Sequence, residues 1–537
     1  MPQIPIAGVG SDFLIPGQYA QLRVAQGPST ASAGAREVVF VMPKLASGGA
    51  WEANSEYRVR GEQDAIDGAG EGSLMHIAIR EFLRHNQGAR IFAVPYLPTS
   101  GTGANAANLD VTITFPTDSN PTAAGTAIIY VGGEACTYTY TAADTATTIA
   151  AALAGAVNAR AWLPVGASAA AGVVTLTAKT AGIAGGDGTI PAHRIRLEVS
   201  ANTNVTFQSE NSLTTDFLGG GAGQSGTDGT TAEATNFAAA LATLDSTRRY
   251  YMVSSTFLAD SVDEGWDLLR AHIANKSAPR VGLRSMGVVG HVGTLAEVTA
   301  DAVTMNDARM RVAWQKGSDK HPAQLAAALA GILQAGHDLS PRFNFDGFRG
   351  RSQRIPNNWA IPAAPANADW PDQDDLNEAI ADGVTVIQSD DLGSYIVRAV
   401  GTRSKDGTGA NNDFRALDDH IVSVGDYMLD RLLIRWALDF AELSLANDTF
   451  LADGVTVDVN AQIGPDTVTP FSARPWFVRQ LNELGPDGEG HLQRIDETTG
   501  GLDVVIDPVT KGRLEVGFTW FATDQLHQMT LRADEAS

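Results

Sequence analysis

The sequence contains a single cysteine, Cys136, among 537 residues. A disulfide within the chain needs two cysteines and a cysteine-based metal site needs several, so the sequence excludes both. So little cysteine is typical of a protein that folds in a reducing cytoplasm.

Long hydrophobic runs are also missing. No uncharged apolar run reaches the ~18 residues of a transmembrane helix. Residues 1–24 contain neither the basic segment nor the long apolar segment of a signal peptide. We therefore expect no direct membrane insertion.

Basic residues are few: 38 Lys and Arg stand against 61 Asp and Glu, which gives a net charge of -23. Such a chain repels phosphate backbones, so nucleic acid is not an expected partner.

Only 18% of residues are charged, and there are 55 glycines. A surface of small residues is common in proteins that pack against copies of themselves, but a GC-rich genome gives the same composition. Both explanations stay open.

Common catalytic motifs do not occur. A G-x-S-x-G nucleophile turn is absent, and His272, His291 and His321 have no partner pattern around them. The loop at 68–73, GAGEGS, lacks the Lys-Ser/Thr of a phosphate-binding loop and has Glu71 where a phosphate would sit. It predicts a tight turn into a helix. We expect no enzyme activity, no catalytic residues and no cofactor.

Metal-binding patterns are missing as well. His76 and His85 do not have the i, i+4 spacing that places two imidazoles on one face of a helix. Asp372, Asp374 and Asp375 lack the ligand order of a calcium loop. The sequence therefore predicts no metal site, and a solvated acidic loop at these aspartates.

The first hundred residues predict an arm followed by α/β structure. Prolines and glycines interrupt residues 1–30 too often for a helix, so an extended N-terminal arm is expected. Apolar runs at 37–43 and 90–96 predict strands, and residues 73–86 predict a helix with a serine N-cap. This order predicts the first part of an α/β core over residues 31–100.

Composition changes over residues 101–230, which are rich in Ala, Thr and Gly. Short alternating runs predict strands, one helix is expected at 145–158, and 131–134 is typical of a hairpin turn. The glycine-rich run 219–231 is expected to be a flexible linker. We interpret the segment as an inserted β-rich outer domain, a decoration domain with its own small core.

Strand and helix patterns alternate again over residues 231–395, the second part of the α/β core. Helices are expected at 233–244, 262–273, 295–305 and 322–334, and strands at 249–255, 285–290, 309–315, 383–389 and 394–403. This order predicts a parallel or mixed sheet covered by helices. A C-terminal α+β domain is expected over 396–500, and a long amphipathic helix at 414–440 opens it.

Residues 501–537 are the most informative segment and are expected to form a C-terminal strand arm. Two strands are expected here, at 502–507 and 513–531. In the second, Leu514, Val516, Phe518 and Trp520 recur with a period of two, which predicts a buried face and an exposed face. Such a strand needs a sheet to join, in the same molecule or in a neighbouring copy. The second case would make this an assembly protein.

Two basic clusters stand out in so acidic a chain. Their members are Arg398, Arg403, Lys405, Arg431 and Arg435. These side chains either pair with acids one helical turn away or meet acidic faces of neighbouring subunits. The sequence leaves both interpretations open.

Three stretches together carry a family resemblance. The first runs from the Gly/Pro-rich arm through VVFVMP and the glycine turn to EFLRHN and RIFAVPY. The second is NFAAALATLDSTRRYYMVSS, and the third extends from YIVRAVGTRSKDG to RLLIRW before a strand-rich tail. In this order they resemble the tail sheath proteins of contractile bacteriophages, specifically the Mu-like branch. The resemblance covers nearly the whole chain.

That resemblance implies a structural subunit that polymerises into stacked hexameric rings around a tail tube. Contraction would drive the tube through the host cell envelope and inject the viral genome. Implied partners are further copies of the chain, the tail tube protein, and the baseplate and tail terminator proteins. Its implied location is the virion tail, after synthesis and assembly in the bacterial host cytoplasm.

Strand exchange between subunits is also implied, with both arms adding strands to sheets of adjacent copies. The residues expected to make these arm contacts are Ile4, Ile6, Phe13, Ile15, Tyr19, Leu514, Val516, Phe518 and Trp520.

Other functions stay open from sequence alone. Sheaths of phage-tail-like bacteriocins and secretion systems share these features, and neighbouring capsid genes would distinguish a virion protein from them. An α/β hydrolase with a carbohydrate-binding insert would need a nucleophile and a base in one pocket. A receptor-binding tail protein would use the insert to contact the host.

Overall fold

The computed structural model describes residues 37–99, 101–114, 120–186, 193–200, 204–213, 215–217, 225–230, 232–244, 250–254, 262–278, 283–336, 371–390, 393–406, 409, 411–413, 417–440, 443–450, 457–458, 466–506 and 514–522. They divide into two compact units, residues 37–423 and residues 424–522, and we describe each by itself. The division falls within helix α10 (Asp419–Phe440).

A mixed eight-stranded sheet organises the first unit, with strand order β16-β15-β14-β13-β12-β1-β3-β2. Its strands are β1 (Glu37–Pro43), β2 (Tyr57–Val59), β3 (Ile91–Tyr96), β12 (Tyr250–Ser254), β13 (Met286–His291), β14 (Met310–Trp314), β15 (Thr385–Asp390) and β16 (Gly393–Arg398). Neighbours from β15 to β3 run parallel, and the edge strands β16 and β2 run antiparallel. The predicted α/β order and mixed sheet are confirmed.

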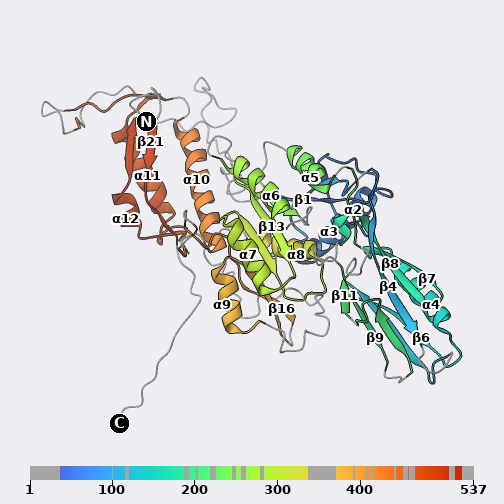
Figure 1. The fold of residues 1–537 in the computed structure, drawn as a ribbon. Helices are drawn as coiled ribbons and strands as arrows, with labels where there is room; N and C mark the ends of the chain where they lie inside the picture. The colour runs from blue at the N-terminus through green and yellow to red at the C-terminus, as the bar shows by residue number, and fades with distance from the viewer. Residues whose placement is uncertain are drawn as a thin grey trace, which may run out of the picture. The chain divides into compact units, whose positions relative to one another are not determined.

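Helices cover both faces of this sheet (Figure 1). They are α2 (Glu62–Ala69), α3 (Leu74–His85), α5 (Glu233–Ala242), α6 (Val262–Ser277), α7 (Leu295–Met305), α8 (Pro322–Gly336) and α9 (Gln373–Ala381). Val38 and Phe40 of β1 pack with α2, α3 and α8, whereas Val39 and Val41 pack with α5, α6, α7 and α9. Both faces of β1 are buried, which explains its continuous apolar run.

A tight glycine turn leads into α3, as predicted. Gly70 and Gly72 have φ angles of 93° and 84°, a region that side chains with a Cβ rarely adopt. The Ser73 hydroxyl then accepts a hydrogen bond from the His76 backbone N–H at 3.0 Å and caps the helix.

The acidic residues near 372 are solvated as predicted, with Asp372 and Asp374 exposed, but they form the start of a helix rather than a loop. Asp372 is the N-cap of α9, and its Oδ1 accepts the backbone N–H groups of Asp374 and Asp375 at 2.9 Å each. Carboxylates are favourable at this end of a helix because they satisfy free N–H groups and the positive end of the helix dipole.

The β-rich segment forms two four-stranded sheets, ordered β10-β4-β8-β7 and β11-β9-β5-β6. Its elements are β4 (Ala106–Thr114), β5 (Gly125–Val131), β6 (Glu134–Tyr140), α4 (Ala146–Asn158), β7 (Val165–Ala170), β8 (Val173–Ala181), the short 3-10 helix Ile183–Gly185, β9 (Arg194–Val199), β10 (Thr206–Ser209) and β11 (Thr215–Phe217). Both sheets and α4 contribute to one apolar core, which includes Cys136. The predicted strands, the helix and the turn between Val131 and Glu134 are confirmed.

The chain enters and leaves this insert side by side. Asn105 forms a β-bridge with Thr227, and the Gly229 N–H donates to the Thr99 hydroxyl at 2.6 Å. The expected flexible linker is therefore wrong for residues 225–230, which are held by hydrogen bonds. Gly226 N–H adds another, to the Gly186 carbonyl at 2.7 Å.

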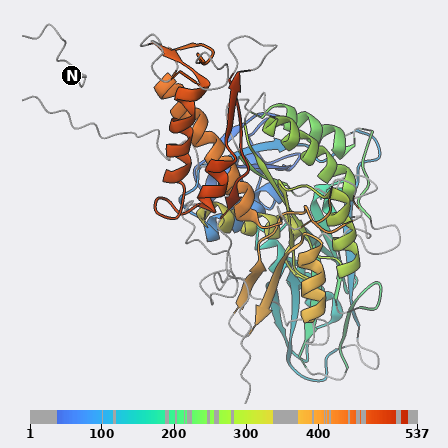
Figure 2. The ribbon, with the colours of Figure 1, turned by 90° about the vertical axis from the view of Figure 1, so that its left-hand side faces the viewer.

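Helices α10 and α11 lie side by side in the second unit (Figure 1 and Figure 2). The other elements are short: β17 (Ser444–Leu445), β18 (Thr467–Val468), α11 (Pro470–Glu483), β19 (Leu492–Gln493), α12 (Ile495–Gly500), β20 (Asp503–Ile506), β21 (Leu514–Gly517) and β22 (Phe521–Ala522). Thr469 caps α11 with a reciprocal capping box to Ser472.

The strand predicted at 502–507 is confirmed as β20, but the second predicted strand is wrong in its continuity, because it breaks after Gly517. β21 ends at Gly517 and pairs antiparallel with β20, placing Leu514 opposite Ile506. β22 then pairs antiparallel with β19. The strands belong to two different two-stranded sheets of the same chain.

Candidate assembly surface

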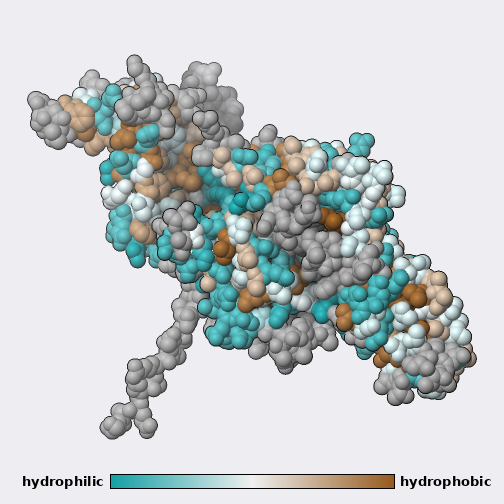
Figure 3. Space-filling view, viewed as in Figure 1, coloured by the Kyte–Doolittle hydropathy of each residue, from teal (hydrophilic) through white to brown (hydrophobic). Residues whose placement is uncertain are grey.

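An apolar groove lies along α10 in the second unit. Its volume is about 290 Å³, and it is lined by Leu429, Leu432, Leu433, Trp436, Phe477, Leu514, Val516 and Phe518. Leu429 is 40% exposed and Leu433 is 60% exposed. Figure 3 shows hydrophobic side chains gathered over α10 and α11. We call these eight residues the α10 groove.

Aromatic side chains support the groove from α10 and α11. The rings of Trp436 and Phe477 stack with centroids 5.2 Å apart, and Phe440 stacks on Trp436 at 4.1 Å. Trp476 donates from Nε1 to the Asp439 carboxylate at 2.7 Å. These contacts fix the positions of the two helices against each other.

The apolar side predicted for the C-terminal strand is part of this groove. Leu514 and Val516 of β21 and the following Phe518 all line it. Trp520 lies against α10, since a Cβ placed on Gly425 would be 3.0 Å from its ring. The structure therefore brings these four predicted residues to α10 of their own chain, and their contact with another subunit stays a prediction.

The other predicted arm residues, Ile4, Ile6, Phe13, Ile15 and Tyr19, lie outside the described residues.

Sequence reasoning missed the α10 half of the groove. Leu429, Leu433 and Trp436 have the i, i+4, i+7 spacing of one helical face. That spacing was available as a signal, but it does not reveal which apolar face stays uncovered in the folded chain.

A two-stranded ribbon, β20 with β21, contributes to the groove. In the described part of the chain, β20 and β21 have no strand neighbour except each other. Isolated two-stranded ribbons are marginal in water, and their outer edges offer N–H and C=O groups to a further strand.

Arg431 and Arg435 pair within the chain, across to α11. Arg431 donates to Glu483 at 2.8 Å, and Arg435 also contacts Glu483. Burial opposes ionisation of Glu483, but the arginines around it lower its pKa. The partner Glu483 is therefore an acid on another element.

Arg398, Arg403 and Lys405 also have partners in their own unit. Arg398 binds both carboxylate oxygens of Asp418 at 2.8 Å. Two longer pairs complete the set: Arg403 with Asp413 at 3.5 Å and Lys405 with Asp382 at 3.1 Å. Contacts of the five basic side chains with neighbouring subunits stay a prediction.

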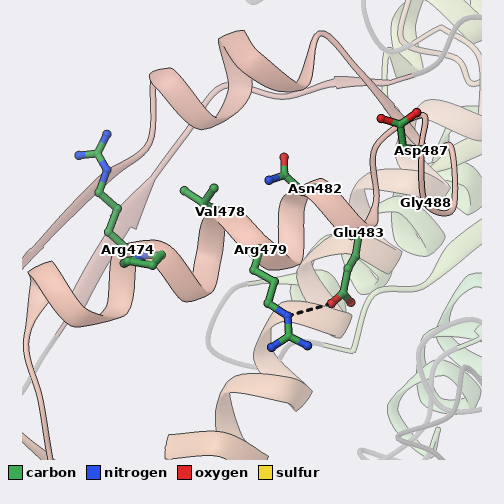
Figure 4. A pocket seen from close by; sticks show the side chains of 8 residues that line it. Arg474, Val478, Arg479, Asn482, Glu483, Asp487 and Gly488 are labelled. Carbon is green, nitrogen blue, oxygen red and sulfur yellow. Dashed lines mark hydrogen bonds and ion pairs between the residues drawn. The ribbon is translucent and has the colours of Figure 1, made fainter.

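A wider hollow of about 790 Å³ lies along the other side of α11. Figure 4 shows Val478 and Asn482 on one side of the helix and the ion pair between Arg479 and Glu483 on the other. Those two side chains are 3.3 Å apart and offset each other's charge. The hollow therefore offers no concentrated charge for an ionic ligand.

Two of the histidines singled out in the sequence, His291 and His321, make local contacts in the α/β core. His291 accepts the Gly293 backbone N–H at 3.0 Å through Nδ1, and its Nε2 lies 3.5 Å from Asp301. His321 accepts the Ala323 N–H at 3.1 Å. No group of three metal-ligating side chains is found among the residues described, and no helix of that part of the chain is long and apolar enough to cross a membrane.

Comparison with known proteins finds similarity at the level of solved structures. No protein-family model and no curated protein sequence matches the chain. The sheath tail protein of Desulfitobacterium hafniense is similar over 94% of this chain and 100% of its own, with 14% identity and a TM-score of 0.41. A sheath tail protein of Listeria innocua is similar over 92% and 98%, with 13% identity and a TM-score of 0.40.

Proposed function

We propose that this chain is a structural subunit of a contractile tail sheath, which polymerises into stacked six-fold rings around a tail tube. The α10 groove is the observation that carries the proposal. It leaves Leu433 60% exposed beside half-buried Leu514 and Val516. Apolar surface of this kind, rimmed by polar residues, is typical of an interface with another protein.

The extended N-terminal arm of a neighbouring copy is the proposed occupant of the groove. Its apolar residues are Ile4, Ile6, Phe13, Ile15 and Tyr19. An extended segment can add a strand to an outer edge of the β20–β21 ribbon and place alternate side chains against α10. One arm would then supply hydrogen-bond partners to the backbone edge of the ribbon and apolar side chains to the α10 groove.

Interface energy would drive contraction. Linked subunits would rotate as rigid bodies into a lattice with more buried surface, so no nucleotide is required. A gain of ~300 Å² of apolar burial for each subunit corresponds to roughly 7 kcal/mol at ~25 cal/mol per Å². Association and ordering costs reduce this figure.

The proposed partners beyond the chain itself are the tail tube protein, the baseplate and the tail terminator proteins. The proposed location is a virion tail assembled in the host cytoplasm. In this role the chain is not an enzyme, and the basic side chains Arg403 and Arg435 would meet acidic faces of adjacent subunits.

Disulfide crosslinking tests arm docking between copies. In a Cys136→Ser background, one population carries Leu433→Cys and a second, tagged population carries Ile6→Cys. After mixing under assembly conditions and oxidation, we expect a crosslink between the two chains. A crosslink that forms only when both cysteines are in one chain, or no crosslink at all, would contradict the proposal.

Leu438 provides the matched control. It lies on the same helix, is 65% exposed, and does not line the groove. Leu438→Cys should give little crosslinking with Ile6→Cys, whereas equal yields from both positions would mean random collision rather than docking.

A further inference from the structure

Two buried histidines meet where the insert contacts the α/β core. His193 immediately precedes β9 of the insert, and His321 immediately precedes α8 of the core. Their ring centroids are 4.7 Å apart, and each residue is only 1% exposed. Nε2 of His193 has no hydrogen-bond partner within the described residues.

Polar contacts join the same two parts around this pair. Arg194 forms an ion pair with Asp319 at 3.3 Å and also donates to the Gly317 carbonyl. Lys320 donates from Nζ to the Gly132 carbonyl, at the turn between β5 and β6, at 3.3 Å. The loop before α8 therefore contacts both the start of β9 and the β5–β6 turn. We call this contact the histidine seam.

We propose that the histidine seam is an acid-sensitive hinge: protonation of His193 and His321 opens it, and the insert moves relative to the core while staying folded. Two imidazolium ions 4.7 Å apart repel each other strongly in a site that excludes water. The paired connections near Thr99 and Thr227 would remain as the tether.

Charged side chains that are next to the pair in sequence, or that interact with those neighbours, come from both parts. The insert contributes Arg194 and Arg196, the loop before α8 contributes Asp319 and Lys320, and α3 contributes Glu81, which interacts with Lys320. Cations already outnumber carboxylates here, so a protonated pair gains little compensation. Burial raises the pKa of Asp319, so its proton uptake favours the closed seam and opposes the histidines. Acid therefore protonates one carboxyl group that favours the closed seam and two imidazoles that favour the open seam.

Because the histidine pKa values differ between the closed and the open seam, they determine the pH range in which the seam opens. Burial lowers the pKa of His193 to about 4, and burial together with His193 lowers the pKa of His321 well below its usual value of 6.5. The closed seam therefore binds fewer protons than the open one. It is favoured above pH ~6.5 and loses this advantage as the pH falls toward ~4. For His193 alone, lowering the pH from 7 to 5 shifts the closed-to-open ratio by about twentyfold.

Hydrogen exchange on the full chain at pH 7 and pH 5 tests the hinge, after correction for the intrinsic pH dependence of exchange. Residues 194–199 and 317–325 should exchange at least tenfold faster at pH 5. A His193→Gln/His321→Gln double variant should lose most of this acid response. His272→Gln is the control, because burial also lowers the pKa of His272 to about 4 and α6 contributes no residue to the seam.

Cys136 distinguishes seam opening from unfolding of the insert. The thiol is buried in the insert core, and dithiodipyridine reacts with thiols at both pH values. We expect faster exchange at the seam with Cys136 still protected at pH 5. The hinge is wrong if exchange does not change with pH, if the double variant keeps the full response, if His272→Gln abolishes it, or if Cys136 becomes reactive together with the seam.

Discussion

The ring of Trp436 stacks on the ring of Phe477 with an interplanar angle of 15° and centroids 5.2 Å apart. This contact joins α10 to α11 and forms the floor of the α10 groove. Because Phe477 is 7% exposed while Leu433 is 60% exposed, the same groove has a rigid base and an open rim. Stability and assembly should therefore be separable by mutation.

Phe477→Ala should destabilise the second unit. Removing a buried phenylalanine costs about 3–5 kcal/mol, because transfer free energy is lost and a cavity remains. Urea unfolding followed by circular dichroism measures the change. Phe471→Ala on the same helix is the control, since Phe471 is 47% exposed and its loss should cost below ~0.5 kcal/mol. Equal effects of the two variants would contradict the packing described.

Arg398→Lys should lower stability although the charge is kept. Arg398 makes two 2.8 Å contacts with Asp418, and a lysine ammonium cannot reproduce that paired geometry. We expect a loss of about 1–2 kcal/mol by chemical denaturation. Arg403→Lys should cost below ~0.5 kcal/mol, because Arg403 reaches Asp413 at 3.5 Å and is 42% exposed.

How far the sequence predicts this fold depends on whether the determining contacts are local. Ser73 caps α3 and apolar runs mark β1 and β3, so these elements are found within a residue or two of the predicted bounds. The insert is also predictable, because period-two strands and one capped helix are local patterns.

Long-range partners explain what the sequence does not predict. Arg431 pairs with Glu483 on another helix, and nothing near Arg431 in the sequence specifies that acid. From the sequence alone Asp372 is interpreted as a loop residue, whereas in the structure it caps helix α9. After Gly517 the chain leaves its pairing with β20 and pairs with β19 instead. Tertiary contacts determine this change of partner, and the continuous period of two in the sequence gives no sign of it.

Glu81→Gln should destabilise the first unit in a pH-dependent way. Burial would raise the pKa of Glu81, but the hydrogen bond from His85 and nearby cations outweigh it and lower the pKa to about 2. The ionised side chain then contributes stability above pH ~4.5, which is lost as the pH falls toward ~2. We expect a deficit of roughly 2–3 kcal/mol at pH 7 that shrinks by pH 3.5.

Urea titrations at pH 7, 5 and 3.5 measure this deficit. Glu62→Gln serves as the control, because the Glu62 side chain is 44% exposed and its ion pair with Arg80 should contribute below ~1 kcal/mol. A Glu81→Gln deficit that does not change between pH 7 and pH 3.5 would exclude the proposed charge effect.

Gly425→Ala tests the position of Trp520 on α10. Alanine in place of glycine normally stabilises a helix by about 1 kcal/mol. At Gly425 the new methyl would be 3.0 Å from the Trp520 ring, so most of that gain should disappear. In a Trp520→Ala background the gain should return. Gly155→Ala in α4, with open space around its Cβ, should stabilise in both backgrounds.

Electron microscopy of the purified protein shows whether the chain assembles into a sheath, with wild type, Leu433→Asp and Leu438→Asp compared under identical conditions. Assembly through the α10 groove predicts striated hollow tubes of uniform width for wild type and Leu438→Asp. For Leu433→Asp it predicts folded single subunits without tubes, because a carboxylate in the α10 groove would prevent docking of the neighbouring arm. Tubes from Leu433→Asp that match wild type, or no ordered assembly from wild type with or without a tail tube added as template, would contradict it.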